Sequence, residues 1–283
     1  MFKFKSAKST LIGFSIGILC VVSSIMMSGN FRSFLNWPSV FITVGGTLGA
    51  MIVAFPPNRL KTLGAVMKKS FSKQTLDLDK DIQTIVTLSN TIRKDGALKL
   101  EDSVDRYTKD EFLKKGLMLL VDGTDREFLK CTMQREIYRT AKRHQKGQQM
   151  IEMIAATAPS LGLLGTYIGL IPMLEHLEDP TKLGPLMAIE LVTSFYGAFI
   201  AYVVFSPMAK RLRSMSSDEM TRKELLLEGL LAIEAKQNPR MIIETLTAYL
   251  TKQEAKSIRR KQQAIPGIDT QKKVLTYNTK RGQ

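Results

Sequence analysis

The sequence predicts an all-α membrane protein with four transmembrane helices and a helical cytoplasmic domain, which the loop between the second and third helices forms together with the C-terminal region. Three observations support this fold class. Four stretches of the 283-residue chain are nearly free of charge, and each is close to the length that a helix needs to cross a bilayer, about 20 residues. Lysine and arginine are distributed very unequally between these stretches, and no segment has the alternating pattern of a β-strand.

The apolar stretches place the spans at about residues 11–27, 39–56, 150–174 and 186–206. The first span is the shortest of the four. We do not expect it to be a cleaved signal peptide, because it has no convincing cleavage site of small residues and a second span follows at once. The first two spans are therefore assigned to residues 1–56, and the other two to residues 150–207.

The positive charges predict the orientation of the chain in the membrane. Residues 57–149 contain 20 Lys and Arg, and the region from Pro207 onward contains 16, whereas the short connections 28–38 and 175–185 contain one each. Because cytoplasmic segments carry an excess of Lys and Arg, we expect both termini and the long middle segment in the cytoplasm. A net charge of +15 can indicate nucleic-acid binding, but here the charge follows the membrane topology, so no nucleic-acid partner is expected.

The cytoplasmic segments have helical patterns. The amphipathic pattern of Phe128–Met153, at the end of the 57–149 domain, continues into the third span and predicts one long helix. Residues 208–250 predict further C-terminal helices, which Asn238-Pro239 interrupts. The tail, residues 251–283, is basic and poor in apolar residues, so we expect it to be disordered.

The sequence contains no pattern typical of an enzyme. The two cysteines, Cys20 and Cys131, have no companions at metal-ligand spacing, and the topology places His144 and His176 on opposite sides of the membrane. A phosphate-binding loop of the Gly-x-x-x-x-Gly-Lys-Ser/Thr type is absent. We therefore expect no enzymatic activity, no cofactor and no metal site.

Residues 158–170, APSLGLLGTYIGL, are unusual for a membrane helix because they carry a proline, three glycines and a hydroxyl. On a helix that advances 100° per residue, these residues share one 120° face: Pro159, Gly162, Gly165, Thr166 and Gly169. A stripe of small residues is typical of close helix–helix packing in lipid, which is the ordinary explanation for the glycines. Thr166 either bonds a carbonyl of its own helix or points its hydroxyl at a guest on this face.

The fourth span repeats this arrangement on a face that carries Glu190, Ser194, Gly197 and Ala201, with Thr193 beside it. We expect the third and fourth helices to line an interior and the first two to lie outside them. A proton or sodium path normally needs an ionisable group near the middle of the membrane, and neither span has a central carboxylate. Either this protein moves no ion, or another chain supplies the carboxylate.

Three stretches of the sequence resemble a known family. The motifs are residues 157–212, TAPSLGLLGTYIGLIPMLEHLEDPTKLGPLMAIELVTSFYGAFIAYVVFSPMAKRL, residues 228–250, EGLLAIEAKQNPRMIIETLTAYL, and residues 93–101, RKDGALKLE. They are similar to the flagellar stator subunits of the MotA branch of the MotA/TolQ/ExbB superfamily, and the resemblance covers nearly the whole chain. TolQ and ExbB share the Gly-Thr-x-x-Gly piece but have three spans, so the extra N-terminal span and the Asn-Pro-Arg tail favour the MotA branch.

This resemblance implies a multi-pass protein of the bacterial inner membrane that forms a homopentamer around two MotB-type chains. Each MotB-type chain brings the ion-binding aspartate that this sequence lacks. The resemblance further implies that inward cation flow is coupled to rotation, and that the cytoplasmic domain exerts torque on the rotor protein FliG.

The family pattern also implies roles for individual residues. Thr166 and Ser194 match hydroxyl positions near the partner's aspartate, where a hydroxyl can solvate a cation or hand on a proton. Pro159 and Pro207 match the prolines at the cytoplasmic ends of the two lining helices, where a proline leaves a carbonyl unpaired and provides a hinge. The charged rotor contacts correspond to Arg93 and Glu101, although charged residues on a cytoplasmic helix are more often simply solvated.

Two positions depart from the family pattern. Ser194 stands where threonine is more common, and the hydroxyl is kept. Glu190 stands where a small apolar residue is more usual, one turn outward of Ser194. It is expected either to gather cations at the outer mouth of the path or simply to reach the lipid headgroups.

Three functions remain as hypotheses. The first is an ion-driven motor subunit, the second a TolQ/ExbB-like energiser of an envelope protein, and the third a membrane scaffold without ion flux. The hydroxyl pair of Thr193 and Ser194 does not distinguish a proton from a sodium ion, and we take the proton as the expected coupling ion.

Overall fold

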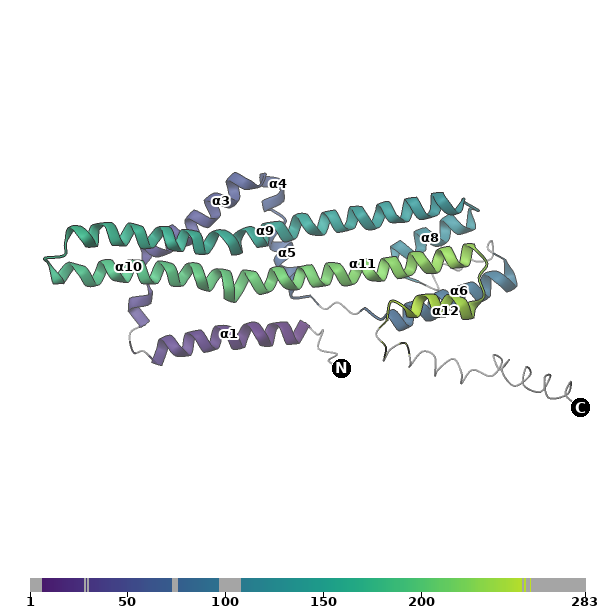
Figure 1. Ribbon diagram of the computed structural model, residues 1–283, viewed down its shortest axis with the longest axis horizontal. Coiled ribbons are helices and arrows are strands. Elements are labelled where there is room, and N and C mark those ends of the chain that lie inside the picture. The colour runs from purple at the N-terminus through teal and green to yellow at the C-terminus, as the bar shows by residue number, and fades with distance from the viewer. Residues whose placement is uncertain are drawn as a thin grey trace, which may run out of the picture. The chain divides into compact units, whose positions relative to one another are not determined.

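The computed structural model describes residues 7–27, 29, 31–72, 76–96, 108–250, 252 and 255, and the regular elements among them are all helical. The all-α fold class is thereby confirmed. The chain divides into two compact units, and Figure 1 labels most of their helices. The first, which we call the membrane unit, combines residues up to Thr75 with Arg139–Asp218, and the second combines Leu76–Tyr138 with the chain from Glu219 onward.

Four helical segments are long and apolar enough to cross a membrane: Thr10–Met27, Trp37–Ala54, and stretches within Arg126–Glu175 and Pro180–Glu234. This agrees with the four spans expected from the sequence. The first span is α1 (Ala7–Met27). A 3-10 helix, η1 (Phe31–Phe34), leads to the second span, which is built from α2 (Trp37–Val40), a π-helical turn η2 (Phe41–Gly45) and α3 (Gly46–Ala54).

The third span belongs to one 50-residue helix, α9 (Arg126–Glu175), as the amphipathic pattern of Phe128–Met153 predicted. The fourth span begins with α10 (Pro180–Ala198), continues through a π-helical turn η4 (Phe199–Phe205), and leads into α11 (Ser206–Glu234). Pro207 explains the position of this turn. A proline has no N–H and its ring crowds the preceding turn, and here the N–H of Ser206 bonds the carbonyl of Ala201, five residues back.

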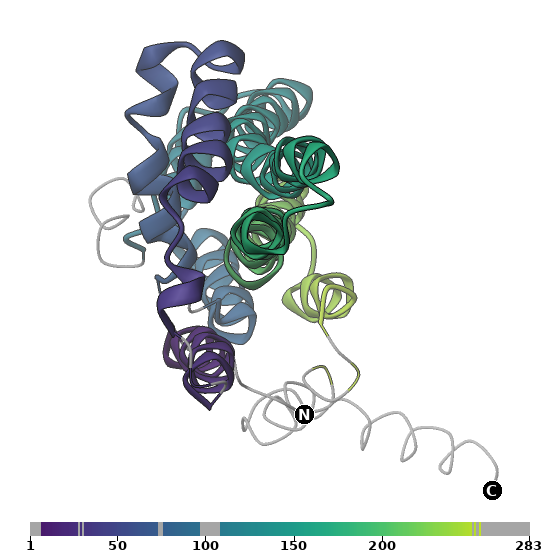
Figure 2. The same cartoon turned by 90° about the vertical axis from the view of Figure 1, so that its left-hand side faces the viewer.

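Inside the membrane unit, apolar side chains join the spans to two short helices, α4 (Pro57–Leu60) and α5 (Leu63–Ser70). Met51 of the second span is buried with Met150 and Ile154 of α9. Figure 2 shows α9 and α10 side by side with the second span next to them. Gly17 of α1 lies close to Val203 of η4. A Cβ atom placed on this glycine in ideal geometry would lie 3.8 Å from Val203 Cγ1, which is van der Waals distance.

The second unit contains α6 (Leu78–Asp95), α8 (Glu111–Val121) and α12 (Pro239–Thr247), together with the first part of α9 and the last part of α11. Side-chain caps fix where its helices start, because a carboxylate or amide oxygen accepts backbone N–H groups that have no partner in the first turn. Asp77 caps α6, Asp110 caps α8, and Asn238 caps α12. The predicted interruption at Asn238-Pro239 is therefore confirmed. Apolar residues of all five segments form one buried core, including Ile82, Leu88, Leu113, Leu117, Leu129, Leu226, Leu230 and Leu246.

The boundaries of these units differ from a division by membrane side. Residues 57–149 were assigned to the cytoplasmic domain, but residues up to Thr75 and from Arg139 onward cluster with the spans. The reason is a set of apolar contacts in which Leu63, Val66 and Met67 of α5 pack against Ile151 and Leu212. Which residues face the cytoplasm remains a prediction from the charge pattern. The tail beyond residue 255 lies outside the described part of the chain.

Candidate functional site

The small residues of the third span pack directly on the fourth span. A Cβ built at Gly162 would lie 3.1 Å from the carbonyl oxygen of Thr193 and 3.3 Å from the Cα of Ser194. A Cβ at Gly197 would lie 2.6 Å from the carbonyl oxygen of Ala158. Real Cβ atoms do not approach backbone atoms this closely, so the glycines allow the backbones of α9 and α10 to touch.

Further along the pair, Gly165 faces Thr193, and Gly169 faces Glu190. The residue numbers rise on α9 as they fall on α10, so the two helices are antiparallel (Figures 1 and 2). The ordinary explanation of the glycine stripe, close helix packing, is thus what the structure shows. The two faces with small residues meet each other within the chain, and the glycines themselves do not receive a guest. Ala201 is also fully buried.

Thr166 lies at the edge of this contact and is partly exposed. Its hydroxyl donates to the carbonyl oxygen of Leu163 in the same helix, at 2.6 Å. A hydroxyl that donates its hydrogen still has lone pairs on its oxygen. Thr166 Oγ1 therefore stays able to accept a hydrogen bond or to ligate a cation. Ser194 of α10 is partly exposed as well, whereas both of its glycine neighbours in the contact, Gly162 and Gly197, are buried.

Thr193 has a different environment from its neighbour Ser194. Its side chain is fully buried, and its Oγ1 lies 2.8 Å from Ser39 Oγ of α2 and within hydrogen-bond distance of the Ile189 carbonyl. Ser39 Oγ in turn lies 3.2 Å from Oδ1 of Asn36, the cap of α2. Of the predicted hydroxyl pair, the structure places Thr193 in a contact between spans and leaves only Ser194 partly exposed.

This hydroxyl network was not predicted from the sequence. A signal was present, because Ser39, Thr43 and Thr47 recur every four residues in the second span, and all three are buried. Each threonine also bonds the carbonyl four residues earlier. This spacing places the three hydroxyls on one helix face, and that face packs towards the fourth span through Ser39.

Glu190 is placed beside Gly169, with its carboxylate oxygen Oε1 buried. Among the described residues, this oxygen has no hydrogen-bond partner. The Glu190 side chain as a whole is partly exposed. Whether it gathers cations at the outer mouth or reaches the headgroups therefore stays a prediction. Of the two predicted hinge prolines, Pro159 lies inside the continuous helix α9, and Pro207 follows the π-helical turn η4. Their role as hinges stays a prediction.

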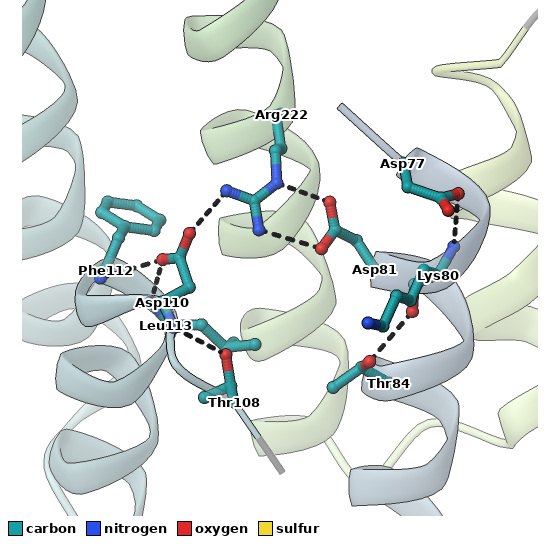
Figure 3. Close-up of polar contacts among 9 residues, drawn as sticks. All are labelled: Asp77, Lys80, Asp81, Thr84, Thr108, Asp110, Phe112, Leu113 and Arg222. Atoms are coloured by element: carbon teal, nitrogen blue, oxygen red, sulfur yellow. Dashed lines mark hydrogen bonds and ion pairs between the residues drawn. The ribbon is translucent and has the colours of Figure 1, made fainter. Parts of the chain in front are cut away.

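The second unit contains an ion cluster that was not predicted from the sequence. Arg222 of α11 lies between Asp81 of α6 and Asp110 at the start of α8 (Figure 3). Its Nε and Nη2 donate to the two carboxylate oxygens of Asp81 at 2.6 and 2.9 Å, and its Nη1 donates to Asp110. The cluster thus joins three helices, and no local pattern in the sequence links residues so far apart.

The ionised forms of Arg222 and Asp110 are favoured in this cluster. The hydrogen bonds from Arg222 to Asp81, and then to Asp110, raise the pKa of the guanidinium in spite of its burial. For Asp110, burial by itself raises the pKa. The hydrogen bond from Arg222 and those from the N–H groups of Leu113 and Phe112 outweigh burial and lower the pKa below its usual range.

Arg93, predicted to contact the rotor, is exposed near the C-terminal end of α6. Its predicted companion Glu101 lies outside the described residues. In the part of the chain that the structure describes, no three His, Cys, Asp or Glu side chains are grouped as metal ligands.

Comparison with known proteins extends along most of the chain. A model of the MotA/TolQ/ExbB proton channel family matches residues 105–225, and a model of the Motility protein A N-terminal region matches residues 11–96. Uncharacterized protein YtxD of Bacillus subtilis is 38% identical over 248 residues, which are 87% of this chain and 91% of that protein. Motility protein A of Cereibacter sphaeroides is 37% identical over 244 residues, which are 86% of this chain and 95% of that protein.

A solved structure of the flagellar MotAB stator complex from Bacillus subtilis contains a similar chain. It superposes with a TM-score of 0.80 at 29% identity, covering 88% of this chain and 98% of the other.

Proposed function

This chain belongs to the MotA/TolQ/ExbB proton channel family, and we infer that it is a stator subunit of the bacterial flagellar motor. It is a multi-pass protein of the inner membrane and assembles with a MotB-type partner in an oligomer. The observation that carries this function is the likeness to a MotAB stator chain over 88% of the sequence. The match of residues 11–96 to the Motility protein A N-terminal region weighs against the TolQ/ExbB-like alternative.

The finer mechanism is our proposal. A pentamer of this chain surrounds two MotB-type helices, and each helix brings an aspartate to the level of Thr166 and Ser194. These two hydroxyl-bearing residues are partly exposed at the edge of the contact between the third and fourth spans. Protons cross by binding the partner's aspartate, and the hydroxyls stabilise the ion where water is excluded. The proposal assigns no enzymatic reaction to the chain.

The continuity of two helices supports coupling to the rotor, because α9 and α11 each contribute residues to both compact units. In this proposal, these helices transmit a displacement of the third or fourth span to the second unit. Pro159 and Pro207 are the hinge positions, and Arg93 and Glu101 contact FliG. One charge that crosses about 100 mV releases roughly 2.3 kcal/mol, so several ions per mechanical step are a reasonable supply of energy.

The test uses Thr166 and a matched serine on the same helix. Thr166→Val removes the oxygen at nearly constant volume, while Thr166→Ser keeps it. Ser160→Ala is the control, because Ser160 is an exposed residue of the same helix whose hydroxyl also bonds its own helix, to the Ala156 carbonyl at 3.2 Å. We expect Thr166→Val to abolish swimming in a strain that depends on this chain, and the other two variants to swim.

If cells with Thr166→Val swim as fast as the wild type, the proposed path is rejected and a scaffold without ion flux is favoured. Co-purification of the MotB-type partner with each variant shows whether the assembly has formed. Swimming speed with sodium replaced by potassium, with and without a protonophore, identifies the ion: protons are supported if only the protonophore stops the cells.

A further inference from the structure

Glu190 is isolated from other charged residues along the sequence of the third and fourth spans. Between Lys182 and Lys210 it is the only charged residue in the sequence, and the facing stretch of α9 between Glu152 and Glu175 has none. Its Oε1 is the only side-chain oxygen or nitrogen in the described residues that is both buried and without a hydrogen-bond partner. A carboxylate in this position has no positive group of the same span beside it to compensate its charge.

Gly169 makes room for this side chain. A Cβ built at Gly169 would lie 2.6 Å from Cγ of Glu190 and 3.1 Å from the carbonyl oxygen of Leu186. Any side chain larger than hydrogen at position 169 would therefore displace the carboxylate stem. The pair thus consists of an acid on α10 and a glycine on α9 whose missing side chain leaves space for the stem of that acid.

The pair is adjacent to the two hydroxyls of the proposed path. Glu190 precedes Ser194 by four residues, which is about 6 Å along a helix, and Gly169 follows Thr166 by three. Glu190 and Gly169 therefore both lie nearer than these hydroxyls to the short loop between the third and fourth spans. The charge pattern places this loop outside the cell. A cation that enters from that side meets Glu190 before it meets Thr166.

The chemistry of the carboxyl group indicates what it binds. An ionised carboxylate only accepts hydrogen bonds, and a buried oxygen without a donor is unfavourable, most of all within a bilayer. Binding a monovalent cation removes this penalty: a proton forms an O–H bond that neutralises the group, and Na⁺ is coordinated by its oxygens. Release of the same ion restores the carboxylate, so no other reactant is needed.

We propose that Glu190 is a cation-binding site of this chain, which takes up H⁺ or Na⁺ on the outer side of Thr166 and releases it towards the partner's carboxylate. This role rests on the proposed stator function and adds a second carboxylate to the ion path, carried by this chain.

The experiment uses the intact complex with its MotB-type partner. Glu190→Gln keeps the size of the side chain and removes the titratable group, and Glu175→Gln, at an exposed carboxylate at the end of α9, is the matched control. Infrared difference spectra of the reconstituted complex are recorded on a change of pH and on exchange of Na⁺ for K⁺. We expect a carboxyl signal that responds to one of the two ions in wild type and in Glu175→Gln, and that is lost in Glu190→Gln.

Swimming gives the second measurement. We expect Glu190→Gln to need roughly tenfold more of the coupling ion for half-maximal speed, as for the loss of a charged site of moderate affinity. Gly169→Ala should shift the dependence in the same direction, whereas Gly49→Ala should not, because a Cβ at Gly49 meets nothing within 4 Å.

The outcomes separate this site from the function on which it rests. If an asparagine in place of the partner's aspartate leaves cells swimming, the stator mechanism itself fails. If that variant stops swimming but Glu190→Gln behaves like Glu175→Gln in both measurements, Glu190 binds no cation and only this inference falls. A wild-type carboxyl signal that responds to neither ion means that a donor from another chain holds Oε1, and also overturns the inference.

Discussion

Thr193 on the fourth span lies against Gly165 on the third span so closely that a Cβ built at Gly165 would be 2.1 Å from Thr193 Cγ2 and 2.7 Å from its Cβ. The threonine cannot turn away easily, because its side chain is fully buried and its hydroxyl is hydrogen-bonded to Ser39. Together with the contacts at Gly162, Gly169 and Gly197, this contact sets the distance between the two helices near Thr166. The spacing of the proposed path therefore depends on glycines.

Gly165→Ala should separate α9 from α10. We expect the added methyl group to cost about 1–3 kcal/mol of stability, as for overpacking in a core, and swimming speed to fall sharply. The measurement is the midpoint of thermal unfolding of the purified complex, together with swimming speed. Gly184→Ala is the control, because a Cβ at Gly184 meets nothing within 4 Å. Equal behaviour of the two variants would show that the contact with Thr193 does not limit the packing.

The hydroxyls of Thr193 and Ser39 should be coupled energetically. Thr193→Val keeps the shape of the side chain and removes the hydrogen bond to Ser39, and we expect a loss of about 1 kcal/mol. Ser39→Ala should cost a similar amount, and the double variant less than the sum of the two. A double-mutant cycle on thermal unfolding measures this coupling. Strictly additive losses would mean that the 2.8 Å contact contributes nothing.

Arg222→Ala should destabilise the second unit strongly, because it leaves Asp81 and Asp110 without their shared partner. Removal of one member of a buried ion pair costs about 3–5 kcal/mol, and partial exposure of the three side chains reduces our expectation to about 2–3 kcal/mol. Arg135→Ala, at an exposed position of α9, serves as the control. The check is denaturant unfolding of the purified complex, and a loss no greater than that of Arg135→Ala would contradict the role of the cluster.

The same cluster predicts sensitivity to acid. The pKa of Asp110 is lower in the folded chain than its ordinary value of about 3.9. Its contribution to stability is therefore complete above that ordinary value and is lost as the pH falls through the lowered pKa. We expect the difference in thermal midpoint between wild type and Asp110→Asn to be largest at neutral pH and to shrink below about pH 4. A difference that does not change with pH would show that ionisation of Asp110 is not involved.

Much of the fold could be predicted because it depends on short segments. The spans follow from the length and apolar composition of each stretch, and the break at Asn238-Pro239 follows from local cap chemistry. The stripe of Gly162, Gly165 and Gly169 was visible as a helical period. The face of the fourth span that packs on this stripe could not be predicted, since a helical period shows which residues share a face but not what covers that face.

The interactions that could not be predicted all join distant parts of the chain. Arg222 meets Asp81 across 141 residues and Asp110 across 112 residues, and Ser39 meets Thr193 across 154 residues. In the sequence, each of these residues has the pattern of an ordinary polar residue of a helix. Only folding decides which of many possible partners is within hydrogen-bond distance.

The sequence by itself determined the helical class, the four spans, the expected orientation and the absence of a central carboxylate. These features depend on the apolar length of each segment and on the charge of its flanks, which are local properties of the chain. Only the tertiary structure decided that Thr193 packs inside while Ser194 stays partly exposed, and that Oε1 of Glu190 is buried beside Gly169. The reason is that neighbouring residues on a helix differ by 100° in direction. What each direction meets is set by the helix that packs there.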